Sequence, residues 1–106
     1  MEKPEKREKG KRVIAELTVI PLGVGTGVSE YVKAALAELN KSGLKVQPTA
    51  MGTILEAGSL EKLFSAVGKA HEAVFKNGAE RVVTMLRIDD RRDEGASIEA
   101  KLEAIR

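Results

Sequence analysis

The sequence has no cysteine and no tryptophan among its 106 residues, and it has one histidine, one tyrosine and two phenylalanines. The absence of cysteine excludes disulfide bonds, thiolate metal sites and thiol catalysis. The single histidine, His71, has no further His or Cys for a metal centre and no partner pattern for a catalytic triad. So few aromatic side chains also disfavour a base-stacking surface for nucleic acid. We therefore expect no metal site, no cofactor and no enzyme activity.

Long apolar runs are also missing. No run approaches the roughly 18 residues that a membrane span requires, and the charged start of the chain is not followed by the apolar segment of a secretion signal. The expectation is a cytoplasmic protein without membrane association.

The positive charge is confined to the start of the chain. Residues 1–12 carry a formal charge of +3, which leaves −1 for residues 13–106 because the whole chain carries +2. We expect residues 1–11 to form a disordered, solubilising basic tail. Contact of this tail with the phosphates of nucleic acid or of a membrane is the less favoured alternative.

The remaining residues, 12–106, are enough for one domain with an aliphatic core. The segment VIAELTVIPLGVGTG, residues 13–27, organises this domain. Its alternating Val13, Ala15, Leu17 and Val19 predict a strand with one apolar face. Pro21 has no N–H to donate and is expected to end this strand, and a glycine-rich loop follows.

The rest of the chain alternates between helix and strand patterns. The expected elements are strands at about 12–20, 44–51, 53–57 and 81–88, and helices at about 28–41, 60–77 and 97–105. We expect Thr26 or Ser29 to cap the first helix and Ser59 to cap the second. Pro48 places the second strand at a sheet edge. The order βαββαβ with a final helix predicts an α+β, ferredoxin-like sandwich: a four-stranded antiparallel sheet with two helices on one face, plus the C-terminal helix.

The other face of this sheet is predicted to be partly apolar. The residues expected there are Ile14, Glu16, Thr18, Ile20, Thr49, Met51, Ile54, Glu56, Val83, Met85 and Arg87. Exposed apolar residues gathered on one face usually mark an interface. We therefore expect the chain to pair with itself as a homodimer or homotetramer, through this face or through a sheet edge.

Three charged residues on that face, Glu16, Glu56 and Arg87, are expected to lie on neighbouring strands. Two carboxylates beside a guanidinium are suited to a cationic or amine-bearing ligand. A structural ion pair inside an oligomer interface is the alternative, and on the residues alone it is slightly favoured.

Two further motifs were considered as anion sites. The glycine-rich loop at 23–27 matches the spacing of neither a phosphate-binding loop nor a dinucleotide-binding loop, so it is interpreted as a turn or as a backbone wall for a small ligand. Arg91 and Arg92 are interpreted as part of an exposed ion-pair cluster in preference to a phosphate site.

Several segments, taken in order, resemble a known family. AELTVIPLG with its glycine loop and SEYV, AMGTILE, KAHEAV and RVVTMLRIDDRRD resemble the small thiamine-binding-protein-like family, whose relatives include the YkoF-like thiamine- and hydroxymethylpyrimidine-binding proteins. The resemblance covers residues 13–105 and implies a ferredoxin-like fold that assembles into dimers and tetramers. It also implies binding of thiamine or its pyrimidine precursor without turnover. The double-domain relatives carry two such units, whereas this chain carries one.

The resemblance and the sheet-face argument together give one set of expected ligand-binding residues. These are Glu16, Thr18, Leu22, Gly52, Thr53, Glu56 and Arg87. The expected function is an oligomeric, non-enzymatic small-molecule binding protein. The alternative is a structural or regulatory oligomer with no small ligand, in which Glu16 and Glu56 are paired across the interface.

Overall fold

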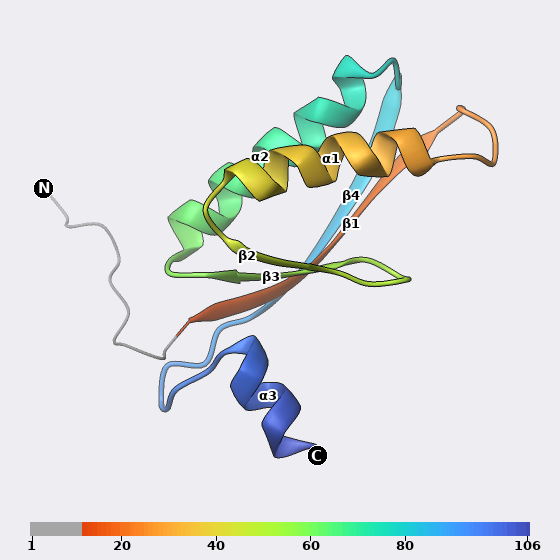
Figure 1. Ribbon diagram of the computed structural model, residues 1–106. Coiled ribbons are helices and arrows are strands. Elements are labelled where there is room, and N and C mark those ends of the chain that lie inside the picture. The colour runs from red at the N-terminus through yellow and green to blue at the C-terminus, as the bar shows by residue number, and fades with distance from the viewer. Residues whose placement is uncertain (1–11) are drawn as a thin grey trace, which may run out of the picture.

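Residues 12–106 are described by a computed structural model, in which two helices cover one face of a sheet and a third helix lies on the other face (Figure 1). The elements are β1 (Val13–Leu22), α1 (Ser29–Lys41), β2 (Lys45–Pro48), β3 (Thr53–Ala57), α2 (Leu60–Lys76), β4 (Arg81–Asp89) and α3 (Ile98–Ala104). The strand order is β2-β3-β1-β4, and every pair is antiparallel. The predicted α+β ferredoxin-like arrangement is confirmed, with β2 and β4 at the edges. The predicted basic tail, residues 1–11, lies outside the described residues.

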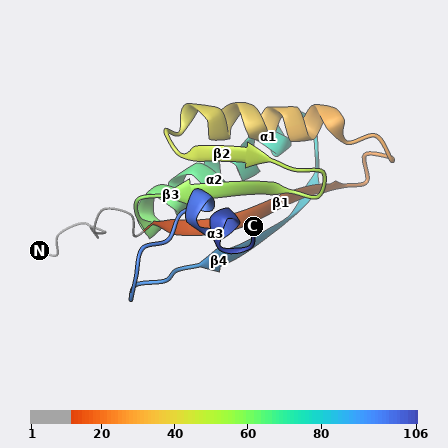
Figure 2. The same cartoon turned by 60° about the horizontal axis from the view of Figure 1, so that its bottom comes forward.

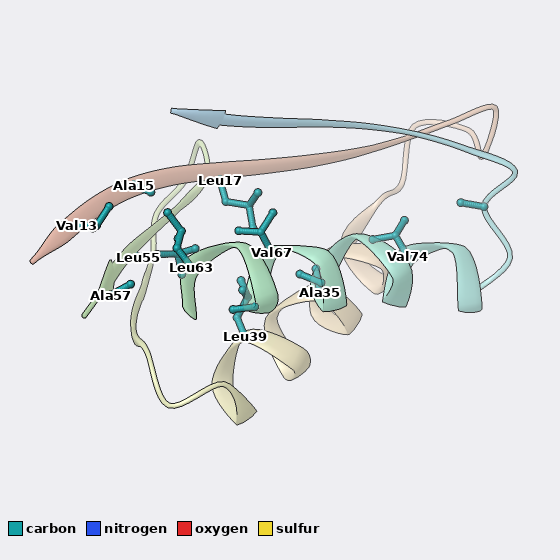
Figure 3. Close-up of a cluster of buried hydrophobic side chains, with 13 residues drawn as sticks. Val13, Ala15, Leu17, Ala35, Leu39, Leu55, Ala57, Leu63, Val67 and Val74 are labelled. Atoms are coloured by element: carbon teal, nitrogen blue, oxygen red, sulfur yellow. The ribbon is translucent and has the colours of Figure 1, made fainter. Parts of the chain in front are cut away.

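The core lies between the sheet and the helices α1 and α2, and it is aliphatic (Figure 3). Its best-buried members are Val13, Ala15 and Leu17 of β1, Leu55 and Ala57 of β3, Ala35 and Leu39 of α1, and Leu63, Ala66, Ala70 and Val74 of α2. These residues follow the two-residue period of strands and the i, i+3, i+4 spacing of helices. Burial of each large aliphatic side chain stabilises the fold by about 1.5–3 kcal/mol.

The helix ends differ in how they are capped. Ser59 caps α2 as predicted, because its Oγ accepts a hydrogen bond from the Lys62 N–H at 3.2 Å. The prediction for α1 was wrong: Val28 is its N-cap residue, and no side chain among residues 12–106 bonds to that end. Packing of Ala35 and Leu39 against the core therefore matters more for α1 than capping does.

Strand β1 does not end before Pro21, as the sequence had predicted, but continues to Leu22. Only its first half, residues 13–17, pairs with β3, whereas residues 14–22 pair with β4. The second half thus has a strand neighbour on one side only. Proline is tolerated in a strand with a free edge, because no ladder bond is required on that side.

Strand β2 is shorter than predicted. It ends at Pro48, and Thr49 then closes a tight turn: its Oγ1 accepts from the N–H groups of Met51 and Gly52 at 3.2 and 3.1 Å. Thr49 and Met51 therefore do not lie in the sheet. Lys45 and Gln47 stand opposite Glu56 and Ile54 of β3, and they occupy the positions that had been predicted for Thr49 and Met51.

Helix α3 lies across the face that α1 and α2 leave open (Figure 2). Ile98 is buried, with 4% of its surface exposed, and the N–H of Arg12 donates to the carbonyl of Ala96 at 3.1 Å. Lys45 lies 3.0 Å from Glu99, and Lys101 pairs with Asp89. One end of the predicted open face is thus covered by the chain itself.

Candidate functional site

An apolar cleft of about 270 Å³ opens beside the second half of β1. It is lined by residues 17–21 of β1, by Val28, Val32, Ala35, Leu36 and Leu39 at α1, and by residues 48–53 of the β2–β3 turn. The cleft exists because β3 ends opposite Leu17 while β1 continues. The space that a longer β3 would occupy is left open between the turn and α1.

The polar groups of this cleft are few and lie on its β1 wall and on the β2–β3 turn. Among the described residues that line it, none carries a charge, and the polar side chains are those of Thr18, Thr49 and Thr53. Residues 18–21 of β1 also present a backbone edge that has no strand neighbour within the described residues. An apolar slot with hydroxyl groups and a free backbone edge is suited to a flat heterocycle with donors and acceptors at its rim.

Gly52 brings the turn into contact with β1. A Cβ atom placed on Gly52 would lie 3.1 Å from Thr18 Oγ1 and 3.2 Å from the carbonyl oxygen of Leu17. Only glycine allows this approach without a shift of the turn or the strand. Thr18, Gly52 and Thr53, three of the residues predicted from the sequence, are thus brought together at one wall of the cleft.

Glu16 and Arg87 form a second group on the open sheet face. Arg87 Nη2 donates to Glu16 Oε1 at 3.1 Å, and 83% of the Arg87 side chain and 34% of the Glu16 side chain are exposed. They line a shallow hollow of about 470 Å³ together with Ile54, Asp89 and Lys101. The Cγ of Glu16 would lie 3.6 Å from a Cβ on Gly52, so Glu16 is next to the turn that forms the cleft.

Glu56 is placed differently from Glu16. It is 8% exposed, its Oε1 accepts from the N–H of Ile98 at 2.7 Å, and its Oε2 lies 3.6 Å from Arg12 Nε. The structure therefore does not gather two carboxylates around one guanidinium. Glu56 stands opposite Ile14 rather than Glu16 in the register, so its carboxylate meets the start of α3.

The other predicted candidates lie outside the cleft. Leu22 is the last residue of β1 and is 36% exposed. His71 Nδ1 lies within hydrogen-bond distance of Thr84 Oγ1, which gives this histidine a structural partner. Arg91 Nε donates to Asp93 at 2.8 Å, and this hydrogen bond lowers the pKa of the Asp93 carboxyl.

Neither a metal site nor a membrane span is present in the part of the chain that the structure describes. Residues 12–106 contain no group of three or more His, Asp or Glu side chains placed to hold a metal ion. The same residues contain no helix with the length and apolar character needed to cross a membrane.

The α1 wall of the cleft was not predicted as part of the site. Val28, Val32 and Leu36 follow the apolar stripe of the helix, and such a stripe normally faces the core. In the structure Val32 is 39% exposed and lines the cleft. The one sequence signal for this cleft was the short spacing between Pro48 and Gly52, which limits the length of the β2–β3 hairpin.

Comparisons with known proteins give consistent matches over nearly the whole domain. The family model described as "Thiamine-binding protein" matches residues 15–106. A UPF0045 protein of Methanothermobacter thermautotrophicus is 47% identical over 95 residues, which cover 89% of this chain and 96% of that protein.

Solved structures show the same arrangement. The crystal structure of a hypothetical protein from Methanocaldococcus jannaschii is similar with a TM-score of 0.83 and 47% identity, covering 90% of this chain and 96% of that one. A domain of unknown function from Bacillus cereus is similar with a TM-score of 0.80 and 31% identity, covering 92% and 93% of the two chains.

Proposed function

Because the chain belongs to the thiamine-binding protein family, we propose that it binds thiamine or its hydroxymethylpyrimidine precursor and releases it unchanged. The observation that carries this proposal is the apolar cleft beside β1, whose shape and polar groups suit the aminopyrimidine ring that both compounds share. A cytoplasmic location and the absence of catalysis are parts of the same proposal.

The size of the cleft favours one ring rather than two. Pockets for drug-sized ligands span roughly 300–1,000 Å³, and this cleft measures about 270 Å³. We place the pyrimidine between the aliphatic side chains of α1 and the β2–β3 turn. Its amino group and ring nitrogens would then pair with the free backbone edge of β1 and with the hydroxyl group of Thr18.

The second ring of thiamine is a cationic thiazolium, and it would lie at the mouth of the cleft. Glu16 is the nearest charged candidate, because its side chain adjoins Gly52. Its ion pair with Arg87 is solvent-exposed and contributes little to stability. Glu16 can therefore turn toward a cation at small cost, while Arg87 stays in water. Glu56 is left out of the proposed contacts because both of its oxygens already have partners.

Self-association through the open sheet face completes the proposal. Met85 is 60% exposed and Val83 is 38% exposed, and both stand beside β1 on the side that α3 leaves uncovered. Apolar side chains exposed together favour a second copy of the chain as their cover. A structural oligomer without a ligand is the alternative function, and the same two residues support it.

Isothermal titration calorimetry of the full chain with hydroxymethylpyrimidine and with thiamine tests the proposal. We expect saturable heat with both compounds. Replacement of Thr18 by valine keeps the shape of the side chain and removes one hydrogen bond, so the affinity for both compounds should fall about tenfold. The Glu16→Gln change should lower the affinity for thiamine and leave the affinity for the uncharged precursor unchanged. The Thr84→Val variant is the matched control outside the cleft.

If neither compound gives a heat of binding, the ligand proposal is wrong and the structural oligomer is the remaining function. Equal loss of affinity in the Thr18→Val and Thr84→Val variants would show that the cleft is not the binding site. Circular dichroism of each variant confirms that the fold is retained before the affinities are compared.

A further inference from the structure

The outer side of α2 carries both phenylalanines of the chain. Phe64 is 52% exposed and Phe75 is 36% exposed, although the core is built from aliphatic residues and has no other large aromatic side chain among its fully buried members. The ring of Phe75 contacts that of His71 edge to face, with 5.3 Å between centroids. Large aromatic surfaces in water are costly, and they are enriched where proteins meet.

Gly68 lies between the two phenylalanines in the middle of α2. A Cβ on Gly68 would meet nothing within 4 Å, so packing inside the chain does not require glycine here. Glycine inside a helix costs about 1 kcal/mol relative to alanine. The bare backbone leaves a notch in the surface of α2, and Gly68 lines a hollow of about 450 Å³. Such a notch allows the close approach of another helix.

The helical period sorts the neighbours of Gly68 into two flanks. At about 100° per residue, Phe64, His71 and Phe75 lie on the side that faces β4, where His71 meets Thr84. Lys69, Glu72 and Lys76 lie on the side that faces α1, and they share the hollow with Glu38. One flank of α2 is therefore aromatic, and the other carries both signs of charge.

We propose that this face of α2 packs antiparallel against α2 of a second copy, about a two-fold axis between Lys69 and Ala70. Phe64 and Phe75 are 11 residues apart, which is about 16 Å along the helix. The two-fold axis places Phe64 opposite the partner's Phe75 and Gly68 opposite the partner's His71. It also keeps each flank on its own side, so aromatic residues meet aromatic residues.

The charges on this face of α2 favour a second copy of the chain as its binding partner. The same axis brings Lys69 next to the partner's Glu72, and it brings Glu61 in the first turn near the partner's Lys76 in the last turn. A parallel two-fold pairing would exchange the flanks, so the charged side of each helix would meet the aromatic side of the other. The pattern is thus self-complementary in one orientation only, as an isologous interface requires. This surface and the sheet-face contact proposed above lie on opposite sides of the sandwich (Figure 1).

Sedimentation equilibrium of the full chain tests the α2 interface, and Met85→Glu serves as a background in which the sheet-face contact is removed. In that background we expect a dimer that dissociates on dilution. The Gly68→Arg change fills the notch with a good helix former, so the monomer should unfold at a higher temperature. Its dimer dissociation constant should rise at least about tenfold, because the helices can no longer approach.

A charge swap gives a second readout that does not depend on the notch. Lys69→Glu and Glu72→Lys should each weaken the dimer, and the double variant should restore it, because the opposed charges then match again. Arg106→Glu, beyond the end of α3 on the other face of the sheet, makes the same change of charge outside the proposed contact and is the control. Unchanged association of Gly68→Arg, no restoration by the swap, or a monomer in the Met85→Glu background would each overturn the proposal. Calorimetry of the same variants with hydroxymethylpyrimidine measures ligand binding independently. A failure of the α2 interface proposal can therefore be told apart from a failure of the ligand proposal.

Discussion

At Gly52 the contact between the β2–β3 turn and β1 leaves no room for a side chain. The Gly52→Ala change should therefore push the turn away from Thr18 and Leu17. We expect a loss of about 1–3 kcal/mol in the free energy of unfolding, together with weaker binding of hydroxymethylpyrimidine. Urea unfolding and calorimetry measure the two effects. In the Gly27→Ala control the new Cβ meets nothing within 4 Å, so both quantities should stay unchanged; an equal response of the two variants would contradict this account.

Glu56 holds the start of α3, and its role can be separated from that of Glu16. The Glu56→Gln change removes the charge that faces Arg12 and weakens the hydrogen bond from the Ile98 N–H. We expect a loss of about 1 kcal/mol in stability and faster hydrogen exchange at the Ile98 amide, with unchanged ligand affinity. If the Ile98 amide of the Glu56→Gln variant still exchanged slowly and the variant lost ligand affinity, Glu56 would be a ligand-binding residue instead.

The residues of the site were predictable where a local rule applies. Thr18 follows from the alternation of β1, whereas Gly52 and Thr53 joined the expected site through the resemblance to the family. The pairing of Glu56 with Ile98 was not predictable, because it joins residues 42 positions apart through a helix whose placement the pattern does not determine. The α1 wall of the cleft was also missed, since cleft-facing and core-facing aliphatic residues have the same period.

Among the elements, β1 and β2 show how far proline rules extend. Pro48 correctly placed β2 at an edge of the sheet. Pro21 was taken as a strand end, but β1 continues through it. Strand β3 begins at Thr53, opposite Leu17, so the residues of β1 after Leu17 have no β3 neighbour. The rule concerns missing hydrogen-bond donors, and it limits a strand only where a neighbour needs them. The partner of each strand, rather than the strand's own sequence, decided the outcome.

Helix α3 depends on ion pairs that acid removes. The hydrogen bond from Lys45 lowers the pKa of Glu99 below its ordinary value of 4.5. A carboxyl whose pKa is lower in the folded state stabilises that state above the unfolded pKa, and this contribution is lost as the pH falls through the folded pKa. We therefore expect the contact between α3 and Lys45 to loosen as the pH falls below about 4.5, while the buried Ile98 and the core elements stay in place.

Carbon chemical shifts of α3, followed by NMR from neutral to acid pH, measure this loosening. Glu99→Gln should reduce the change between neutral and acid conditions, whereas Glu103→Gln, whose partner Arg106 lies just beyond the end of α3, should behave like the unaltered chain. Loss of the α3 and core signals at the same pH would show that α3 is not a separate unit.

For the whole molecule, the two faces of the sheet have different tasks in this account. One face packs on α1 and α2, and the other is divided between α3 and the exposed residues Val83 and Met85. Met85→Glu places a charge in the proposed sheet-face contact, so the mass of the assembly at a given concentration should fall. Light scattering after size-exclusion chromatography measures it. Ile105→Glu, at an 82% exposed residue beyond α3, is the control; equal masses for both variants would place the contact elsewhere.

The main proposal is that the cleft beside β1 binds an aminopyrimidine. NMR titration of the full chain with hydroxymethylpyrimidine tests this proposal most directly. We predict saturable shifts of the backbone amides of residues 18–20 and 49–53, with thiamine shifting the same amides and Glu16 in addition. Amides of α3 and of the outer side of α2 should stay in place. Unshifted amides along β1 and the turn at saturating ligand, or shifts confined to the Glu16–Arg87 hollow, would contradict the account.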